Sequence, residues 1–203
     1  MRVAVVGVAI LAALVAGLLY VEETEPTWYV QLRYPLEYEH IVRGHAENYE
    51  LDAALIAAVI YRESKFDADA RSSSGAIGLM QLLPDTAMGI AVNTEGHRFR
   101  VSDLYDPEIN VRYGSFYLRR LLLKYGDERL ALAAYNAGQT NVDEWLANGG
   151  EIEFPETREY VEDVLHAREV YARAYADELG LDDSRSPEEP EPPQIDGSTS
   201  DTD

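Results

Sequence analysis

Hydrophobic residues recur at helical spacing through the middle of the chain, from about residue 30 to residue 180. Between His40 and Tyr49 the apolar side chains fall on one face. Residues 53–61 are apolar on every side, which is typical of a helix buried in a core. No stretch longer than a few residues alternates between apolar and polar positions, as a half-buried strand would. The pattern therefore predicts one all-α domain over residues 30–180.

Residues that favour the first turn of a helix stand at the boundaries of these segments. Asp52 is a suitable N-cap for the buried helix, and Asp127 is one for a helix over residues 130–137. Proline is also favoured at the first helical position, because its missing N–H would have no partner there. Three prolines occupy such places: Pro84, Pro107 and Pro155. We expect the last of these three helices to run to residue 179 or 180.

The two ends of the chain differ from this central domain. Residues 3–20 form an uncharged apolar run, preceded by Arg2 and followed by Glu22 and Glu23. As a helix this run would span roughly 27 Å, slightly less than the ~30 Å hydrocarbon core of a bilayer. We therefore expect residues 1–22 to be a signal peptide or a transmembrane anchor, and the rest of the chain to be exported. A buried core helix is the less favoured alternative, because no polar residue interrupts the run.

The C-terminal segment is more acidic than the rest of the chain, and the net charge of the whole chain excludes one class of partner. Acidic residues outnumber basic ones by 37 to 17, which gives a net charge of −20. Residues 181–203 hold eight acids, one arginine and four prolines. We expect this acidic segment to be disordered, because it has too little apolar surface to offset its ordering entropy. A nucleic-acid partner is not expected for so acidic a chain, and the absence of cysteine excludes disulfides and thiol chemistry.

One carboxylate stands out as a candidate catalytic group. Glu63 lies where the buried helix ends, and both the helix dipole and apolar surroundings disfavour its ionised form there. A glutamic acid that stays protonated near neutral pH can serve as a general acid. A solvated glutamate at a helix end is the alternative. Residues 72–81 read as a polar, glycine-punctuated connection, and residues 134–138 could line a sugar site or could be a core tyrosine and a helix cap.

Five short motifs, taken in order along the chain, resemble those of a known family, and this resemblance decides between the alternatives. Together they closely resemble the soluble lytic transglycosylase catalytic domain of the lysozyme-like superfamily, over about residues 35–176. The motifs are Glu63-Ser64, Gly75 to Gln81, Asn110-Val111 with Gly114 and Tyr117-Leu118, Ala134 to Gly138, and Pro155 to Val161. Two positions depart from the common family pattern. Leu83 replaces a frequent methionine, and Ala53 replaces a frequent proline after Asp52.

The resemblance implies a lysozyme-like helical fold and a specific reaction. Glu63 would protonate the glycosidic oxygen between N-acetylmuramic acid and N-acetylglucosamine in peptidoglycan, and would then act as a base toward the muramoyl C6 hydroxyl. The product would be a 1,6-anhydro sugar, with the substrate's N-acetyl group replacing the second carboxylate of ordinary glycosidases. The implied sugar contacts are Ser72, Gln81, Tyr117, Tyr135 and Asn136, with Glu156 as a contact or a supporting residue.

Two other functions remain open on the sequence. A hydrolytic muramidase of the same fold would need a second carboxylate, for which the candidates are Asp67, Asp69, Asp85 and Glu156. A non-catalytic wall-binding scaffold would not need Glu63. The expected partners are peptidoglycan glycan strands, the membrane and other envelope proteins. No metal or cofactor is expected, because the histidines are scattered and the segment that begins at Asp67 lacks the glycine and glutamate of a calcium loop. Three tyrosines at helical spacing are interpreted as packing residues: Tyr160, Tyr171 and Tyr175.

Overall fold

The computed structural model describes residues 7, 11, 15–17, 20, 26–93 and 98–181. Most of the predicted signal or anchor segment and nearly all of the predicted disordered tail lie outside these residues. The described elements are α2 (Thr27–Arg33), α3 (Glu39–Tyr49), α4 (Ala53–Ser64), α5 (Pro84–Asn93), the 3-10 helix η1 (Val101–Tyr105), α6 (Pro107–Tyr125), α7 (Glu128–Ala137), α8 (Gln139–Asn148), α9 (Pro155–Ala174) and α10 (Ala176–Leu179). Extended pairing among the described residues is confined to two isolated bridges near Ile77. The all-α prediction is confirmed.

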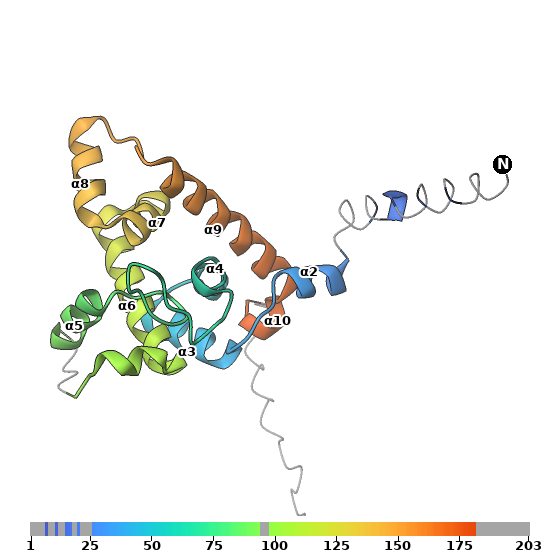
Figure 1. Cartoon of the computed structure of the whole chain (residues 1–203), viewed down its shortest axis with the longest axis horizontal. Helices are drawn as coiled ribbons and strands as arrows, with labels where there is room; N and C mark the ends of the chain where they lie inside the picture. The colour runs from blue at the N-terminus through green and yellow to red at the C-terminus, as the bar shows by residue number, and fades with distance from the viewer. Residues whose placement is uncertain are drawn as a thin grey trace, which may run out of the picture.

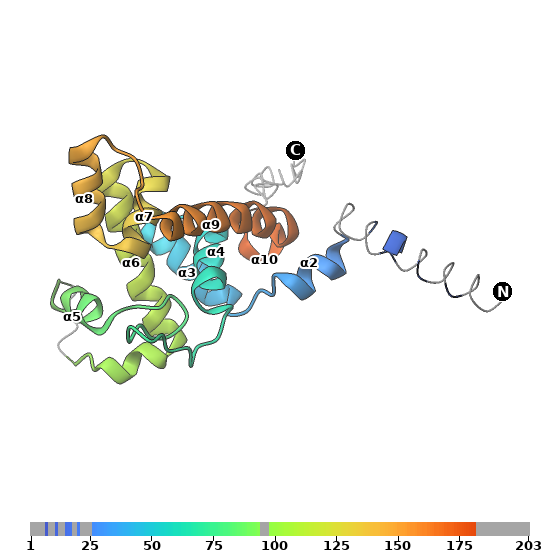
Figure 2. The same ribbon diagram turned by 45° about the horizontal axis from the view of Figure 1, so that its top comes forward.

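Helix α4 lies at the centre of the main core, as its apolar sequence predicts. Residues 53–60 are all buried, and α9 packs along α4. Figures 1 and 2 show α9 crossing the molecule, with α7 and α8 near one end and α2 and α10 near the other. A smaller core of apolar residues lies under α5, η1 and α6. Tyr117 and Tyr135 pack against both cores. These two tyrosines therefore join the two cores.

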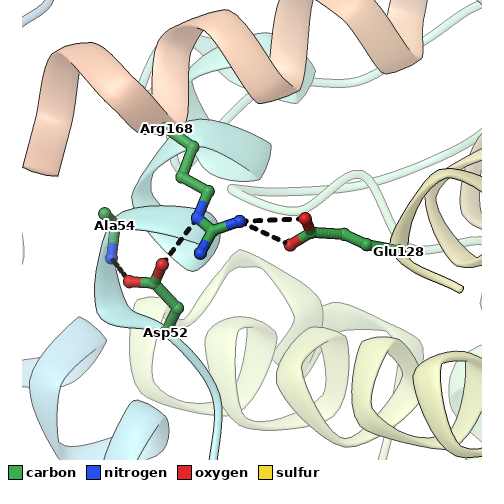
Figure 3. A network of polar contacts seen from close by, with 4 residues as sticks. All are labelled: Asp52, Ala54, Glu128 and Arg168. Atoms are coloured by element: carbon green, nitrogen blue, oxygen red, sulfur yellow. Dashed lines mark hydrogen bonds and ion pairs between the residues drawn. The ribbon is translucent and has the colours of Figure 1, made fainter. Parts of the chain in front are cut away.

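Aspartate caps hold three helix starts, two of them at the predicted caps Asp52 and Asp127. Asp52 Oδ1 accepts a hydrogen bond from the backbone N–H of Ala54 at 2.9 Å. Asp106 and Asp127 cap α6 and α7 in the same way. Arg168 on α9 adds a tertiary link, because its guanidinium donates to Asp52 Oδ2 at 2.6 Å and to both carboxylate oxygens of Glu128 at 2.9 Å. Figure 3 shows this guanidinium between the first turns of α4 and α7. It therefore holds two helix N-termini against α9.

The predicted continuous helix from Pro155 to residue 179 is wrong beyond Ala174. Tyr175 leaves helical geometry, with φ −136° and ψ 33°, and α10 follows as a separate short helix. The Tyr175 ring is buried, and its hydroxyl donates to the backbone carbonyl of Tyr34 at 2.8 Å. The break lets this side chain reach the core near the start of the domain. Within the part of the chain that the structure describes, no helix is both long enough and apolar enough to cross a bilayer.

Candidate active site

Glu63 occupies the last turn of α4, at the boundary of the main core. The helix ends at Lys65, whose left-handed backbone (φ 53°) turns the chain away from the helix axis. The Ser64 hydroxyl donates to the carbonyl of Leu79 at 2.8 Å and so ties this helix end to the loop of residues 70–82. The Glu63 side chain is half-buried between that loop and α9. The loop thus holds the helix end that carries Glu63, and α9 contacts its carboxyl group.

Burial gives Glu63 an unusual acidity. Loss of water around the carboxylate raises the pKa of Glu63 from 4.5 to about 7. The hydroxyl of Tyr160 donates to Glu63 Oε1 at 2.7 Å, and this hydrogen bond lowers the pKa, as does the positive charge of Arg62. Arg62 lies over the Tyr160 ring and donates to Asp163 at 3.0 Å. Glu63 is therefore divided between its acidic and ionised forms near neutral pH.

Asn110 shapes the loop that faces Glu63. It is fully buried on α6, and its amide nitrogen donates to the carbonyls of Ile77 at 2.9 Å and Leu104 at 2.8 Å. Its side-chain oxygen accepts from the backbone N–H of Met80 at 2.8 Å. Gly78 permits this approach, since a Cβ there would lie 2.2 Å from the Asn110 amide nitrogen. One buried side chain on α6 thus binds two backbone groups of the loop and one of η1, and so ties both segments to the helix.

Gln81 and Ser72 present polar groups from this loop. Gln81 has a left-handed backbone (φ 47°), which is uncommon for a residue other than glycine. Its amide nitrogen donates to the carbonyls of Ala70 at 3.2 Å and Gly78 at 2.9 Å. The side-chain oxygen is the group of Gln81 that can accept a hydrogen bond from a ligand. The Ser72 hydroxyl accepts from the backbone N–H of Ala76 at 3.0 Å.

Helix α7 supplies the opposite wall. The Tyr135 hydroxyl donates to the carbonyl of Met80 at 2.8 Å, and its ring lies 5.5 Å from the ring of Tyr117. The exposed side chain of Asn136 accepts through Oδ1 from the buried hydroxyl of Thr157 at 2.9 Å. This bond orients the amide so that its NH₂ group stays available as a donor. Two neighbouring residues on one helix end therefore offer an aromatic ring and a hydrogen-bond donor.

These groups surround a single cavity of about 390 Å³. All seven residues that the sequence singled out line it: Glu63, Ser72, Gln81, Tyr117, Tyr135, Asn136 and Glu156. Their roles toward a substrate stay predictions. Of the four carboxylates considered as a second catalytic group, Glu156 lines the cavity, whereas Asp67, Asp69 and Asp85 are not among its lining residues. Glu156 is exposed in the first turn of α9.

Two residues at the site were not recognised from the sequence. Tyr160 was interpreted as a packing residue, and it is buried, but its hydroxyl contacts the candidate acid directly. Asn110 was noted within a motif without a role. Tyr171 and Tyr175 are packing residues as predicted, with hydroxyls that donate to backbone carbonyls. Nothing in the helical spacing distinguishes Tyr160 from Tyr171, because both lie on the buried face of α9.

A larger hollow of about 650 Å³ lies between α3, the start of α4 and α10. Its lining includes His40, Arg43, Glu47 and Asp52. The described residues hold no group of three or more histidine, aspartate or glutamate side chains placed to bind a metal ion. The cavity at Glu63 is therefore the candidate active site, because it joins a poised acid to neutral hydrogen-bonding groups.

Comparison with known proteins relates the chain to lytic murein transglycosylases. The soluble lytic murein transglycosylase of Escherichia coli K12 is 32% identical over 160 residues, which cover 72% of this chain and 24% of that protein. A membrane-bound lytic murein transglycosylase F of Yersinia pestis is 39% identical over 108 residues, 50% of this chain and 20% of that protein. The chain thus matches about a quarter of the length of these relatives.

A solved structure and a family model extend the likeness. The crystal structure of the 70 kDa soluble lytic transglycosylase of Escherichia coli matches with a TM-score of 0.68 and 30% identity, over 75% of this chain and 27% of that one. The family model named Transglycosylase SLT domain matches residues 40–156, which include the whole cavity lining. With the fold, the poised acid and this match in agreement, the chain belongs to the transglycosylase SLT domain family.

Proposed function

We propose that this domain is a peptidoglycan lytic transglycosylase in which Glu63 acts first as a general acid and then as a general base. The observation that carries the proposal is a glutamic acid with a pKa of about 7 in a cavity lined mainly by neutral polar groups. An acid–base group works best when its pKa lies near the working pH, because both protonation states are then accessible. The family relation and the names of the relatives support the same activity.

The first step would cleave the bond between N-acetylmuramic acid and N-acetylglucosamine. Protonated Glu63 donates its proton to the glycosidic oxygen as the bond from that oxygen to the muramoyl C1 breaks. The N-acetyl group of the muramic acid stabilises the positive charge that develops at C1. The Tyr160 hydroxyl keeps its hydrogen bond to the carboxylate that remains, which favours the ionised form at this stage.

The second step would use the same carboxylate as a base. Glu63 accepts the proton of the muramoyl C6 hydroxyl while that oxygen bonds to C1 and closes the 1,6-anhydro ring. The proton lost in the first step is thus regained, and no water is consumed. Sugar contacts would come from the side chains around the cavity: Ser72, Gln81, Tyr117, Tyr135, Asn136 and Glu156. Since the chain is strongly acidic, these short-range contacts, not bulk attraction, would hold the glycan.

A muramidase is the second candidate, and the position of Glu156 favours it. Glu63 and Glu156 are the two carboxylates among the described residues that line the cavity, so Glu156 could position a water molecule. Mass spectrometry of digested peptidoglycan separates the two reactions. Anhydro-muramic acid ends are expected from the wild type, whereas reducing muramic acid ends would replace the transglycosylase proposal by the muramidase.

Two glutamate variants, one of the candidate acid and one at the surface, complete this experiment. Glu63→Gln should lower the rate of glycan release by about 10²–10⁴-fold, the usual contribution of a positioned acid–base group. Glu159→Gln, on the exposed surface of α9 and not among the lining residues, is the matched control and should keep full activity. A Glu63→Gln protein as active as the wild type would overturn the role of Glu63 in catalysis, whereas a wild type that releases no glycan would leave only the wall-binding scaffold.

We also propose that the chain is exported and that residues 1–22 anchor it in a membrane. The apolar composition of residues 3–20 supports an anchor, and the described apolar side chains of that run, Leu11, Val15 and Tyr20, are exposed to solvent and not packed in the core. The same segment could instead be a cleaved signal. Flotation of the full chain with lipid vesicles tests the anchor, and N-terminal sequencing of the mature protein tests cleavage. Envelope proteins remain expected partners.

A further inference from the structure

Helix α2 has one face against the domain and one face that the described part of the chain leaves exposed. Val30 is 6% exposed, and α2 contacts α9. Trp28 and Leu32 lie four residues apart, on one face of the helix, and are 60% and 76% exposed. A tryptophan and a leucine side by side in water expose a large apolar area. The question is what covers this face, which we call the Trp28–Leu32 face.

The Trp28–Leu32 face is fixed rigidly to the helix that carries the candidate acid. The Tyr61 hydroxyl, two residues before Glu63, donates to the carbonyl of Arg33 at 2.9 Å at the end of α2. The ring of Tyr34 lies 4.9 Å from the ring of Tyr61. Two more tyrosine hydroxyls hold the backbone that follows α2. Tyr171 donates to the carbonyl of Pro35 and Tyr175 donates to the carbonyl of Tyr34, each at 2.8 Å.

The order of segments along the chain indicates the occupant. Pro26 caps α2, and only residues 21–25 separate it from the uncharged run of residues 3–20. Five residues reach at most about 18 Å when fully extended. If residues 3–20 lie in a bilayer, α2 must lie close to the layer of lipid headgroups. Tryptophan is enriched in that layer, because its ring is apolar while its N–H can still meet water.

Charge at this place argues against a purely electrostatic contact. Within α2 the one charged residue is Arg33, and Glu22, Glu23 and Glu25 lie in the short connection. These acids would be repelled by anionic lipids, so attraction must come from apolar burial. A zwitterionic membrane surface therefore fits the Trp28–Leu32 face better than an anionic one does.

We propose that the Trp28–Leu32 face inserts into the interfacial layer of the bilayer and holds the catalytic domain in one orientation above it. The inference rests on the proposed membrane anchor. Because α2 is clamped to α4 and α9, the cavity at Glu63 would then lie at a set height from the lipid surface. Glycan strands close to the membrane would be the ones within its reach. In Figures 1 and 2, α2 lies at the end of α9 remote from α7, so the membrane would leave the cavity open.

The chain carries its own fluorescent reporter for this contact. Of its two tryptophans, Trp145 is 4% exposed in the core, so lipid can reach only Trp28. The full chain is placed in phosphatidylcholine vesicles with lipids brominated near the headgroup end of the acyl chain, since bromine quenches nearby indoles. The expected result is a loss of about half the emission, because one of two emitters is quenched.

Two variants serve as controls. Trp28→Phe leaves Trp145 alone and should show little quenching. Adding Leu123→Trp to that variant places an emitter on α6, on the other side of α4 from α2, where the side chain is 68% exposed. This second emitter should also escape quenching. Because Trp28 and Leu32 are not among the residues that line the cavity, Trp28→Phe should release soluble glycan products at the wild-type rate.

The outcomes separate this inference from the proposals on which it rests. A chain that floats with the vesicles but keeps its Trp28 emission overturns the lipid contact alone. A chain that does not float overturns the anchor and this inference together, whereas glycan cleavage is judged independently from its products. Trp28 emission that escapes bromine quenching at high protein density, and is quenched only after the protein is diluted with lipid, would mean that a second copy covers the face. That result would also overturn the inference.

Discussion

Replacing Glu63 by glutamine should stabilise the fold at neutral and alkaline pH while it removes activity. The amide has nearly the shape of the acid, and its oxygen can still accept the hydrogen bond of the Tyr160 hydroxyl. What changes is charge. The wild type must keep a half-buried carboxylate ionised above neutral pH, and the variant has no such group.

The size of the effect follows from the acidity of Glu63. The pKa of this group is 4.5 when it is free in water and about 7 in the folded domain. Each unit is worth about 1.4 kcal/mol, so the difference corresponds to about 3 kcal/mol. The sign is set by the raised pKa: the contribution of Glu63 to wild-type stability is complete below pH 4.5, falls as the pH rises, and is lost above pH 7. The variant lacks this decline.

Urea unfolding followed by circular dichroism at pH 4, 6 and 8 measures the difference. At pH 4 the two proteins should have equal stability, because the acid is neutral in both folded and unfolded chains. At pH 8 the variant should be more stable by about 3 kcal/mol, or about 6–12 °C in Tm for a domain of this size. Glu159→Gln, at an exposed position on α9, is the control and should show a gap that does not change with pH. An equal gap at pH 4 and pH 8 for Glu63→Gln would refute the raised pKa.

Three further predictions concern the neighbours of Glu63 and the helix network. Tyr160→Phe removes a hydrogen bond that lowers the pKa of Glu63, so the alkaline limb of the rate–pH profile should move to higher pH; an unmoved limb would contradict the contact. Asn110→Ala removes three buried hydrogen bonds, to Ile77 and Met80 in the loop and to Leu104 in η1, and should cost about 3 kcal/mol or more in urea unfolding; a loss under about 1 kcal/mol would show that the loop does not depend on Asn110. Arg168→Ala should cost about 1 kcal/mol, because its partners are partly exposed and screened by water. Thermal unfolding at low and high salt tests this, and a loss that salt does not reduce would argue against an ionic origin.

The helix starts could be predicted because their determinants are local. Asp52, Asp106 and Asp127 each accept from a backbone N–H two or three residues ahead, so the sequence contains both partners within a few positions. The end of α9 could not be predicted in the same way. Tyr175 breaks the helix to reach the carbonyl of Tyr34, a residue 141 positions earlier, and no local pattern reports such a contact.

The same distinction between local and distant contacts applies to the candidate site. Glu63 could be singled out because an acid at the end of an all-apolar helix is visible in the sequence, and the family motifs supplied the other lining residues. Tyr160 could not be recognised, since its partner lies 97 residues away and its spacing on α9 resembles that of any buried tyrosine. Asn110 meets its loop partners across as many as 33 residues.

By itself the sequence determined that the chain is helical, where most helices begin, and which acid ends the buried one. These properties depend on side-chain spacing and on hydrogen bonds between near neighbours. Only the tertiary structure decided how acidic Glu63 is, because its pKa depends on how much water the loop of residues 70–82 and α9 exclude and on the hydroxyl that α9 brings to it. Desolvation is a property of packing, and packing joins residues that the sequence keeps far apart.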